Sequence, residues 1–217
     1  EGEVAAVIME PLVQGAGGMI VHPDGYLCAV RELCDRHGVL LICDEVATGF
    51  GRTGTMFAVE QEGVSPDFLC LAKGITAGYL PLAATLTTEA VYEGFLGAPA
   101  EAKTFFHGHT YTGNPIACAV ALANLDVFER ERTVERLQPK IALIEQRLTE
   151  IAEMPGVTEV RSRGVMIGID LGEHDSELRV GHRVTLEARQ RGALVRSLGD
   201  VVVLMPPLSI SEEELET

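Results

Sequence analysis

The chain has 217 residues, of which 47% are hydrophobic, enough for one good-sized domain or for a large domain with a small one. Its 17 basic and 32 acidic residues give a net charge of −15, which argues against nucleic acid or an anionic membrane as a partner. No apolar stretch is long enough to span a bilayer and no signal peptide is recognisable, so we expect a cytoplasmic protein. Both ends look truncated, and we expect a fragment of a longer chain.

The first half of the chain contains three short apolar runs separated by helical or glycine-rich segments. Such runs are typical of strands buried on both faces of a parallel sheet, and they cover residues 4–9, 39–43 and 68–72. Between the first two, Pro23 opens a predicted helix and Gly38 ends it, which completes a β-α-β unit. Open α/β sheets bind ligands at the carboxyl ends of their strands. The residues that follow the three runs should therefore meet in one crevice: they are Glu10, Asp44 and Lys73.

The middle of the chain predicts one more strand and two long helices. The strand covers residues 80–87. Asn114 as N-cap, with proline in the first turn, predicts a helix to about Arg130. A second helix should cover residues 134–154, and Pro139 lies inside its first turns, where proline favours a kink.

After the second helix the pattern changes to shorter elements. Strands are predicted at residues 157–161, 165–171 and 201–205, and a helix is predicted at residues 177–190. We therefore expect residues 1–130 to form part of a larger domain and residues 131–217 to form a small α+β domain.

Five cysteines are present, and none belongs to a CxxC pair: Cys28, Cys34, Cys43, Cys70 and Cys118. Two of them, Cys43 and Cys70, lie inside the apolar runs. We expect free, buried thiols in a reducing compartment.

Lys73 ends an apolar run and is followed by Gly74. Lysine is rarely buried without a task. Desolvation favours the neutral amine, which is a nucleophile toward aldehydes. An exposed lysine in a loop after a strand explains the same spacing equally well.

Asp44 ends another run, and no basic residue is adjacent to it in sequence. A buried carboxylate needs a cationic partner. A protonated pyridine nitrogen would serve, since the ring could then act as an electron sink. Alternatively, Asp44-Glu45 could form a metal or nucleotide site of the Walker B kind, but that site needs a phosphate loop and the chain has no GxxxxGK[ST].

Gly49, Gly51 and Gly54 match the G-x-G-x-x-G spacing of dinucleotide sites. Such sites need their glycines directly at the turn from strand to helix. Here the glycines begin five residues past Asp44, and the segment after them is too short for a well-packed helix. We favour a glycine-rich loop that borders a site.

His107 and His109 have i, i+2 spacing without a third ligand cluster, and we predict no metal site from them. Residues 110–114 follow directly and precede the start of a helix. Hydroxyls and backbone N–H groups at that place suit a phosphate.

Together these segments resemble the class III aminotransferases, which are pyridoxal-phosphate enzymes of fold type I. The resemblance rests on Glu10-Pro11 with Gln14-Gly15, on residues 44–54 and on residues 71–74. The interval from Asp44 to Lys73, 73 − 44 = 29 residues, matches as well. The resemblance implies an α/β fold, with the mostly parallel sheet of a partial large domain followed by the small α+β domain. It also implies pyridoxal 5′-phosphate as the cofactor.

The same resemblance implies roles for single residues. Lys73 would carry the cofactor as a Schiff base and contact substrate, Asp44 would hold the pyridine nitrogen, and these two are the expected catalytic residues. Val46 would pack against the cofactor ring. Thr110 would bind the cofactor phosphate of the partner across a homodimer interface, and His109 would contact the cofactor beside it through its backbone.

Two further residues are expected to contact substrate. Gly108 would flank the phosphate site, and Arg196 would bind the carboxylate of the keto substrate, a task that suits the fork of a guanidinium. A surface arginine beside a strand would explain Arg196 equally well.

Residues 103–114, 195–196 and 203–207 resemble the branch of the class that aminates 8-amino-7-oxononanoate in biotin biosynthesis. S-Adenosylmethionine is the usual amino donor of that branch, and lysine serves in some relatives. Another class III aminotransferase, acting on an ω-amino acid or a diamine, is the alternative within the class. A nucleotide-binding module built on the glycine loop and a non-catalytic interaction domain are the alternatives outside it.

The family's upstream glycine-serine phosphate loop and its ring-stacking aromatic residue are absent from these 217 residues. We therefore expect the chain alone to bind cofactor poorly and to be inactive.

Overall fold

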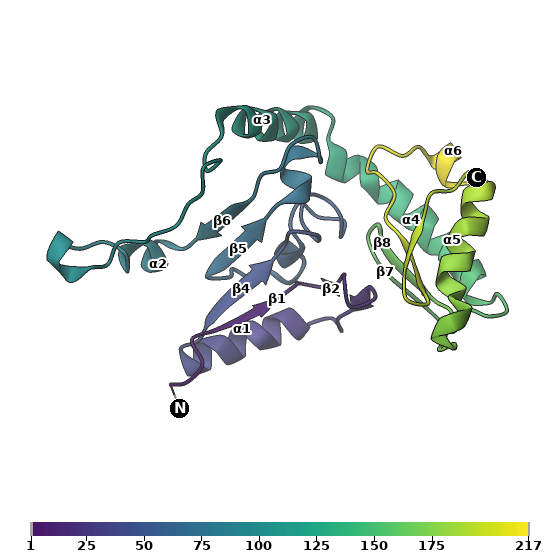
Figure 1. The fold of residues 1–217 in the computed structure, drawn as a ribbon, viewed down its shortest axis with the longest axis horizontal. Helices are drawn as coiled ribbons and strands as arrows, with labels where there is room; N and C mark the ends of the chain where they lie inside the picture. Colours follow the sequence, from purple (N-terminus) through teal and green to yellow (C-terminus); the bar gives the residue numbers. More distant parts are fainter. Residues whose placement is uncertain (1, 217) are drawn as a thin grey trace.

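The computed structural model describes residues 2–216, which form two four-stranded sheets linked by two long helices (Figure 1). The first sheet contains three parallel strands and one antiparallel strand at its edge. In spatial order its strands are β1 (Ala6–Met9), β4 (Leu40–Asp44), β5 (Phe68–Leu71) and β6 (Ala84–Thr87). The three predicted parallel strands are confirmed, and the predicted strand at residues 80–87 is confirmed for its second half.

Helix α1 (Tyr26–His37) covers one face of this sheet. It ends at Gly38, whose left-handed backbone (φ 64°) is available to glycine at little cost. The buried Leu27 and Cys34 of α1 pack against Leu41 and Cys43 of β4. The β-α-β unit predicted from the sequence is therefore present.

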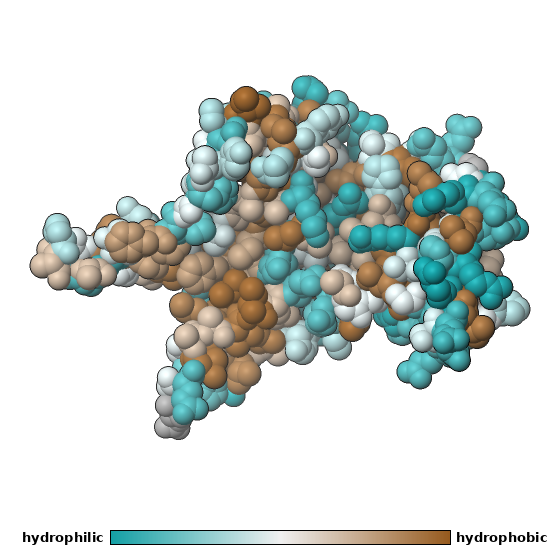
Figure 2. Space-filling model, viewed as in Figure 1, coloured by the Kyte–Doolittle hydropathy of each residue, from teal (hydrophilic) through white to brown (hydrophobic). Residues whose placement is uncertain are grey.

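The opposite face of the first sheet is uncovered by the described residues. Side chains alternate between the two faces of a strand, so Ile8, Ile42 and Asp44 point away from α1. Ile8 is 65% exposed. Figure 2 shows hydrophobic residues gathered at the surface around β1, whereas the surface over the second sheet is mostly hydrophilic.

Cys70 lies on this same open face, because it pairs in register with Asp44. The side chain of Cys70 is consequently half-buried, and the predicted burial is wrong for it. Cys34 and Cys43 are buried as expected, whereas Cys28 and Cys118 are half-buried like Cys70, and all five cysteines are free.

Two short strands, β2 (Val13–Gln14) and β3 (Ile20–Val21), form a ribbon that the sequence pattern did not predict. Each has only two residues, too few to show a periodic pattern. The ribbon packs against the second sheet, since Val13 and Met19 share a buried cluster with Met166 and Val203.

Between β6 and α3 (Pro115–Arg130) the chain forms an arm that extends away from the body (Figure 1). It contains the short helix α2 (Glu89–Glu93) and a turn of 3-10 helix, Pro99–Glu101. Residues 102–109 have no regular structure, and every residue from 102 to 110 is exposed.

Helix α3 (Pro115–Arg130) begins where the sequence predicted. The Oδ1 atom of Asn114 accepts hydrogen bonds from the N–H groups of Ile116 (3.0 Å) and Ala117 (3.2 Å), which satisfies two donors of the first turn. Helix α4 (Thr133–Ala152) follows and continues through Pro139. The predicted division of the chain at residue 130 coincides with the junction of these helices and remains a prediction.

The second sheet is antiparallel throughout, and α4 packs against it. Its strands, in spatial order, are β7 (Glu159–Arg163), β8 (Met166–Asp170), β10 (Val201–Leu204) and β9 (Arg196–Leu198). Helix α5 (Val180–Gln190) joins β8 to β9, and α6 (Glu212–Leu215) lies near the end of the chain. In residues 2–216 no helix is long and apolar enough to cross a membrane.

The two sheets are joined by backbone contacts as well as by apolar packing. The N–H group of Val165 donates to the carbonyl of Arg52 at 3.0 Å. Gly164, with φ 62°, lies so close to the loop after β4 that a Cβ atom would be 2.5 Å from the carbonyl carbon of Thr53. Only glycine permits this approach.

Candidate active site

Asp44 is the last residue of β4, and its side chain is half-buried on the open face of the first sheet. Its Oδ1 atom accepts a hydrogen bond from the N–H group of Val46 at 3.0 Å. Among residues 2–216 no lysine, arginine or histidine forms an ion pair with Asp44. A carboxylate oriented in this way can accept a hydrogen bond from a cationic N–H group of a ligand.

The neighbouring Glu45 has a structural role instead. It is fully buried, and its carboxylate accepts hydrogen bonds from the N–H groups of Ala58 (2.8 Å) and Val59 (2.9 Å). Burial raises the pKa of Glu45, although these two N–H groups oppose the shift. Glu45 thus fixes the backbone directly after Asp44 to the 3-10 helix Ala58–Glu62.

Lys73 follows β5 and is the first residue of the 3-10 helix Lys73–Thr76. Its backbone is left-handed, with φ 43°, a conformation that non-glycine residues seldom adopt. The sequence left a buried and an exposed Lys73 equally open, and in the structure the side chain is exposed.

The structure brings Asp44 and Lys73 to the same edge of the first sheet. Strands β4 and β5 are adjacent and parallel, and Asp44 lies opposite Cys70 in register. Adjacent strands are about 4.8 Å apart, and the three residues from Cys70 to Lys73 span at most roughly 10 Å. The two backbones are therefore close enough for both side chains to reach one small ring. Glu10 follows the parallel strand β1 at the same edge, where its carboxylate accepts the N–H group of Gly15 at 2.8 Å.

The glycines of the loop lie close to other parts of the chain, one to a neighbouring residue and two to distant segments. At Gly49 a Cβ atom would lie 2.9 Å from the carbonyl oxygen of Glu45. Gly51 (φ 87°) approaches Leu208, and Gly54 (φ 103°) approaches Ile141. The loop leads into a 3-10 helix, whereas a dinucleotide site needs an α-helix at that place. The loop therefore borders the site, and its geometry does not fit a dinucleotide.

Gly108, His109 and Thr110 lie on the arm between β6 and α3, and all three are exposed. The turn is held by local hydrogen bonds. The N–H group of His109 donates to Oγ1 of Thr112 at 2.8 Å, and the backbone N–H group of Tyr111 donates to Nδ1 of His109 at 3.1 Å. Within residues 2–216 there is no group of three or more His, Cys, Asp or Glu side chains that could hold a metal ion.

Arg196 is the first residue of β9 and pairs in register with Val203 of β10. Its side chain is exposed, and no carboxylate of residues 2–216 forms an ion pair with it. A guanidinium in this state is available for an anionic ligand.

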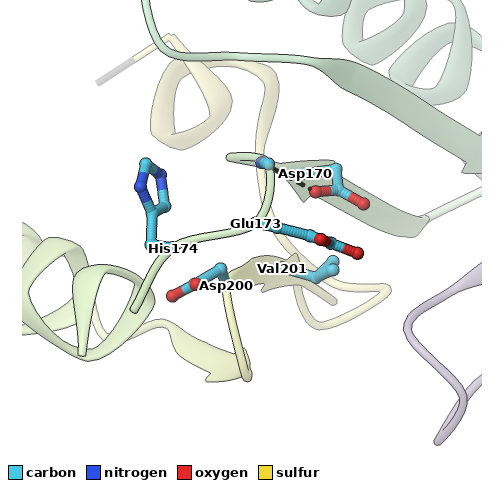
Figure 3. A pocket seen from close by; sticks show the side chains of 6 residues that line it. Asp170, Glu173, His174, Asp200 and Val201 are labelled. Atoms are coloured by element: carbon cyan, nitrogen blue, oxygen red, sulfur yellow. Dashed lines mark hydrogen bonds between the residues drawn. The ribbon is translucent and has the colours of Figure 1, made fainter. Parts of the chain in front are cut away.

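An open hollow of about 420 Å³ lies in the second sheet and contains none of the predicted site residues (Figure 3). Its carboxylates serve the fold. Asp170 accepts hydrogen bonds from the N–H group of Gly172 (2.9 Å) and from Arg161 (3.0 Å), and these interactions lower its pKa. Asp200 accepts the N–H group of Gly181 at 3.0 Å. The hollow is lined by Asp170, Gly172, Glu173, His174, Asp200 and Val201.

The sequence model of the family "Aminotransferase class-III" matches residues 1–217. The chain belongs to the class III aminotransferases. It is 63% identical to the adenosylmethionine-8-amino-7-oxononanoate aminotransferase of Nitratidesulfovibrio vulgaris, over 99% of this chain and 41% of that protein. As a class III aminotransferase it spans about half the length of the curated relatives that it matches.

Solved structures show the same fold. The adenosylmethionine-8-amino-7-oxononanoate aminotransferase of Methanocaldococcus jannaschii superposes with a TM-score of 0.94 at 46% identity, over 97% of this chain and 50% of that one. An amine transaminase from an uncultivated Pseudomonas species, solved in its PLP-bound form, superposes with a TM-score of 0.90 at 44% identity, over 97% of this chain and 49% of that one. The predicted α/β fold of type I, with its parallel-dominated sheet, is confirmed.

Class III aminotransferases use pyridoxal phosphate, and the residues of this chain fit that cofactor. The half-buried carboxylate of Asp44 has no cationic partner among the described residues, which suits a protonated ring nitrogen. Lys73 supplies a primary amine at the same edge of the sheet. The sequence found both residues from their positions after apolar runs. It missed the contacts of the turn after Lys73, where the side chain of Asn124 donates to the carbonyls of Gly74 and Ile75.

Proposed function

We propose that the full-length protein is a pyridoxal-phosphate-dependent aminotransferase of biotin biosynthesis. It converts 8-amino-7-oxononanoate to 7,8-diaminononanoate, with S-adenosylmethionine as the amino donor. The observation that carries this proposal is the placement of Asp44 and Lys73 after adjacent parallel strands, with Asp44 lacking a cationic partner in residues 2–216. The choice of substrate is supported by the names of relatives at 46–63% identity.

The bound cofactor supplies an electron sink for the charge that develops when the substrate loses its α-proton. Asp44 accepts a hydrogen bond from the ring nitrogen and keeps that nitrogen protonated, because a carboxylate stabilises an adjacent cation. Val46 supports this role: its N–H group occupies Oδ1 of Asp44 and thereby orients the carboxylate, and its side chain packs against the ring.

Lys73 has two tasks in the proposed reaction. Its amine holds the cofactor covalently in the resting enzyme, and after the amino donor displaces it, the free amine acts as general base and acid at the substrate's α-carbon. Arg196 binds the carboxylate of the keto substrate through its exposed guanidinium.

The proposed enzyme is a homodimer. The arm that carries Gly108, His109 and Thr110 extends away from the body of the chain (Figure 1), which suits a contact with a second subunit. Thr110 then contributes its hydroxyl to the cofactor phosphate of the partner, and Gly108 and His109 flank that site.

Replacement of Lys73 tests the proposal. In the full-length protein, Lys73→Ala should abolish turnover and the visible absorbance of the covalently held cofactor. Lys140→Ala is the matched control, because Lys140 is also a lysine but donates to the carbonyl of Leu208 in the other half of the molecule. Multiple turnovers of Lys73→Ala at a normal rate would refute the role of Lys73.

A substrate panel tests the reaction. 8-Amino-7-oxononanoate should be aminated with S-adenosylmethionine as donor, and lysine should be compared as donor. The second candidate is an aminotransferase for an ω-amino acid or a diamine, which the similarity to an amine transaminase supports. Turnover of such amines with no amination of 8-amino-7-oxononanoate would establish this second candidate and reject the first.

A further inference from the structure

The turn that carries Lys73 is strained and needs support from its surroundings. Lys73 has φ 43° and Ala77, four residues on, has φ 51°. Non-glycine residues persist in this region only when the surrounding structure holds them there, and such residues cluster at functional sites. Within the turn, the hydroxyl of Thr76 donates to the carbonyl of Leu80 at 2.5 Å. This contact closes the far end of the turn. Nearer to Lys73, the N–H group of Ala77 donates to the carbonyl of Gly74 at 3.1 Å and that of Gly78 to the carbonyl of Lys73 at 3.3 Å. A further hold on these residues comes from another element.

Asn124 of α3 provides that hold. Its Nδ2 atom donates to the carbonyl of Gly74 at 2.8 Å and to the carbonyl of Ile75 at 3.2 Å. These carbonyls belong to the two residues that directly follow Lys73. Asn124 is half-buried, so both hydrogen bonds are partly shielded from water, which strengthens them.

Asparagine is a poor choice for the interior of a helix, since its side chain competes for backbone hydrogen bonds. In α3 it lies in an alanine-rich stretch, where leucine or alanine would favour the helix more. The two carbonyl contacts give a physical reason for the residue at this position. Phe50 also packs closely on the turn, because a Cβ atom at Gly74 would lie only 2.7 Å from the Cβ atom of Phe50.

We infer that Asn124 is a positioning residue for Lys73: it fixes the peptide groups after Lys73 and so aims the amine at the cofactor's aldehyde carbon. This inference rests on the proposed function. The reaction that depends on the aim is the condensation of Lys73 Nζ with the aldehyde, which forms a C=N bond and releases one water molecule. Both hydrogens of the neutral amine and the oxygen of the aldehyde leave in that water.

Binding of two ligands distinguishes a misplaced Lys73 amine from damage to the rest of the site. Pyridoxal 5′-phosphate carries the aldehyde, whereas pyridoxine 5′-phosphate carries an alcohol at the same carbon and cannot condense with an amine. In the full-length apoprotein, Asn124→Leu and the nearly isosteric Asn124→Asp should weaken binding of pyridoxal 5′-phosphate about tenfold, as expected for two lost hydrogen bonds. Binding of pyridoxine 5′-phosphate should stay within about twofold of wild type.

Gln138→Met is the matched control. Gln138 also uses one side-chain amide to contact two carbonyls, those of Gly54 (2.8 Å) and Val134 (3.0 Å), but it lies on α4 and has no contact with the Lys73 turn. This variant should bind both ligands as wild type does.

Two outcomes would overturn the inference. One is that both Asn124 variants bind the two ligands as tightly as wild type, and the other is that both ligands weaken equally, which indicates a general structural role. Borohydride reduction of the wild-type complex, followed by peptide mass analysis, tests the proposed function separately from the role of Asn124. Cofactor attached to Lys73 after reduction supports the proposed function, whatever the Asn124 variants do. A wild-type complex in which Lys73 carries no cofactor rejects the proposed function itself.

Discussion

Gly74→Ala is a sharp test of how the fold holds the turn after Lys73. A Cβ atom at Gly74 would lie 2.7 Å from the Cβ atom of Phe50 and 2.9 Å from its Cγ and Cδ2 atoms. Phe50 is 3% exposed and its ring packs against Phe57 and Phe128, with centroid separations of 5.5 and 6.4 Å. Because the closest contact is to Cβ, rotation of the Phe50 ring does not relieve the overlap. Either the turn or the glycine-rich loop must move.

The size of the effect follows from two opposing contributions. Overpacking in a close-packed site costs about 1–3 kcal/mol. Replacing glycine by alanine also restricts the unfolded chain, which stabilises the fold by about 0.4–1 kcal/mol. We therefore expect Gly74→Ala to lower the free energy of unfolding by about 1–2 kcal/mol. Since Lys73 precedes Gly74, the displaced turn should also weaken covalent binding of the cofactor.

Urea unfolding of the full-length apoprotein measures the first effect, and the visible absorbance after addition of pyridoxal 5′-phosphate measures the second. Gly17→Ala is the matched control, because its new Cβ atom would meet only the flexible end of Gln14, at 3.2 Å, and its backbone φ is ordinary. The control should be neutral or slightly stabilising. If the two variants unfold at the same urea concentration and take up cofactor equally, the close packing of Gly74 on Phe50 does not position Lys73.

Burial raises the pKa of Glu45, so the folded state binds the proton of this carboxyl more tightly than the unfolded state does. The stability gained from this proton is present at low pH and is lost as the pH rises from the ordinary glutamate range through the raised pKa. Glu45→Gln should remove that decline, which thermal unfolding at a series of pH values would measure; an unchanged pH dependence would contradict the assignment. Arg196→Ala should raise KM for the keto substrate far more than it changes the cofactor absorbance, and equal damage to both would argue against its role.

The sequence by itself determined the parallel strands and the residues at their carboxyl ends. Apolar runs of five or six residues produce a strong local signal because every side chain in them is suited to burial, and the polar residues that follow them, Asp44 and Lys73, are conspicuous. The caps of α1 and α3 were also predictable, since Gly38 and Asn114 act through their own backbone or their nearest N–H groups.

The sequence could not show why Glu45 differs from Asp44. The two carboxylates are adjacent in the chain, yet Glu45 accepts hydrogen bonds from two buried N–H groups of a 3-10 helix, whereas Asp44 lies on the open face of the first sheet. Strand alternation sends the side chains of neighbouring residues in opposite directions. Their environments therefore depend on what packs on each face, and that is set by distant segments.

Only the tertiary structure decided how Lys73 is held and how accessible it is. Its support comes from Phe50 and Asn124, which lie far from it in sequence and contact the turn only after the first sheet and α3 have packed together. The sequence left open whether Lys73 is buried or exposed, because exposure depends on what packs around the side chain, and the structure shows that it is exposed. Local pattern specifies strands and caps, whereas the hydrogen bonds and free space around a side chain are properties of the packed molecule.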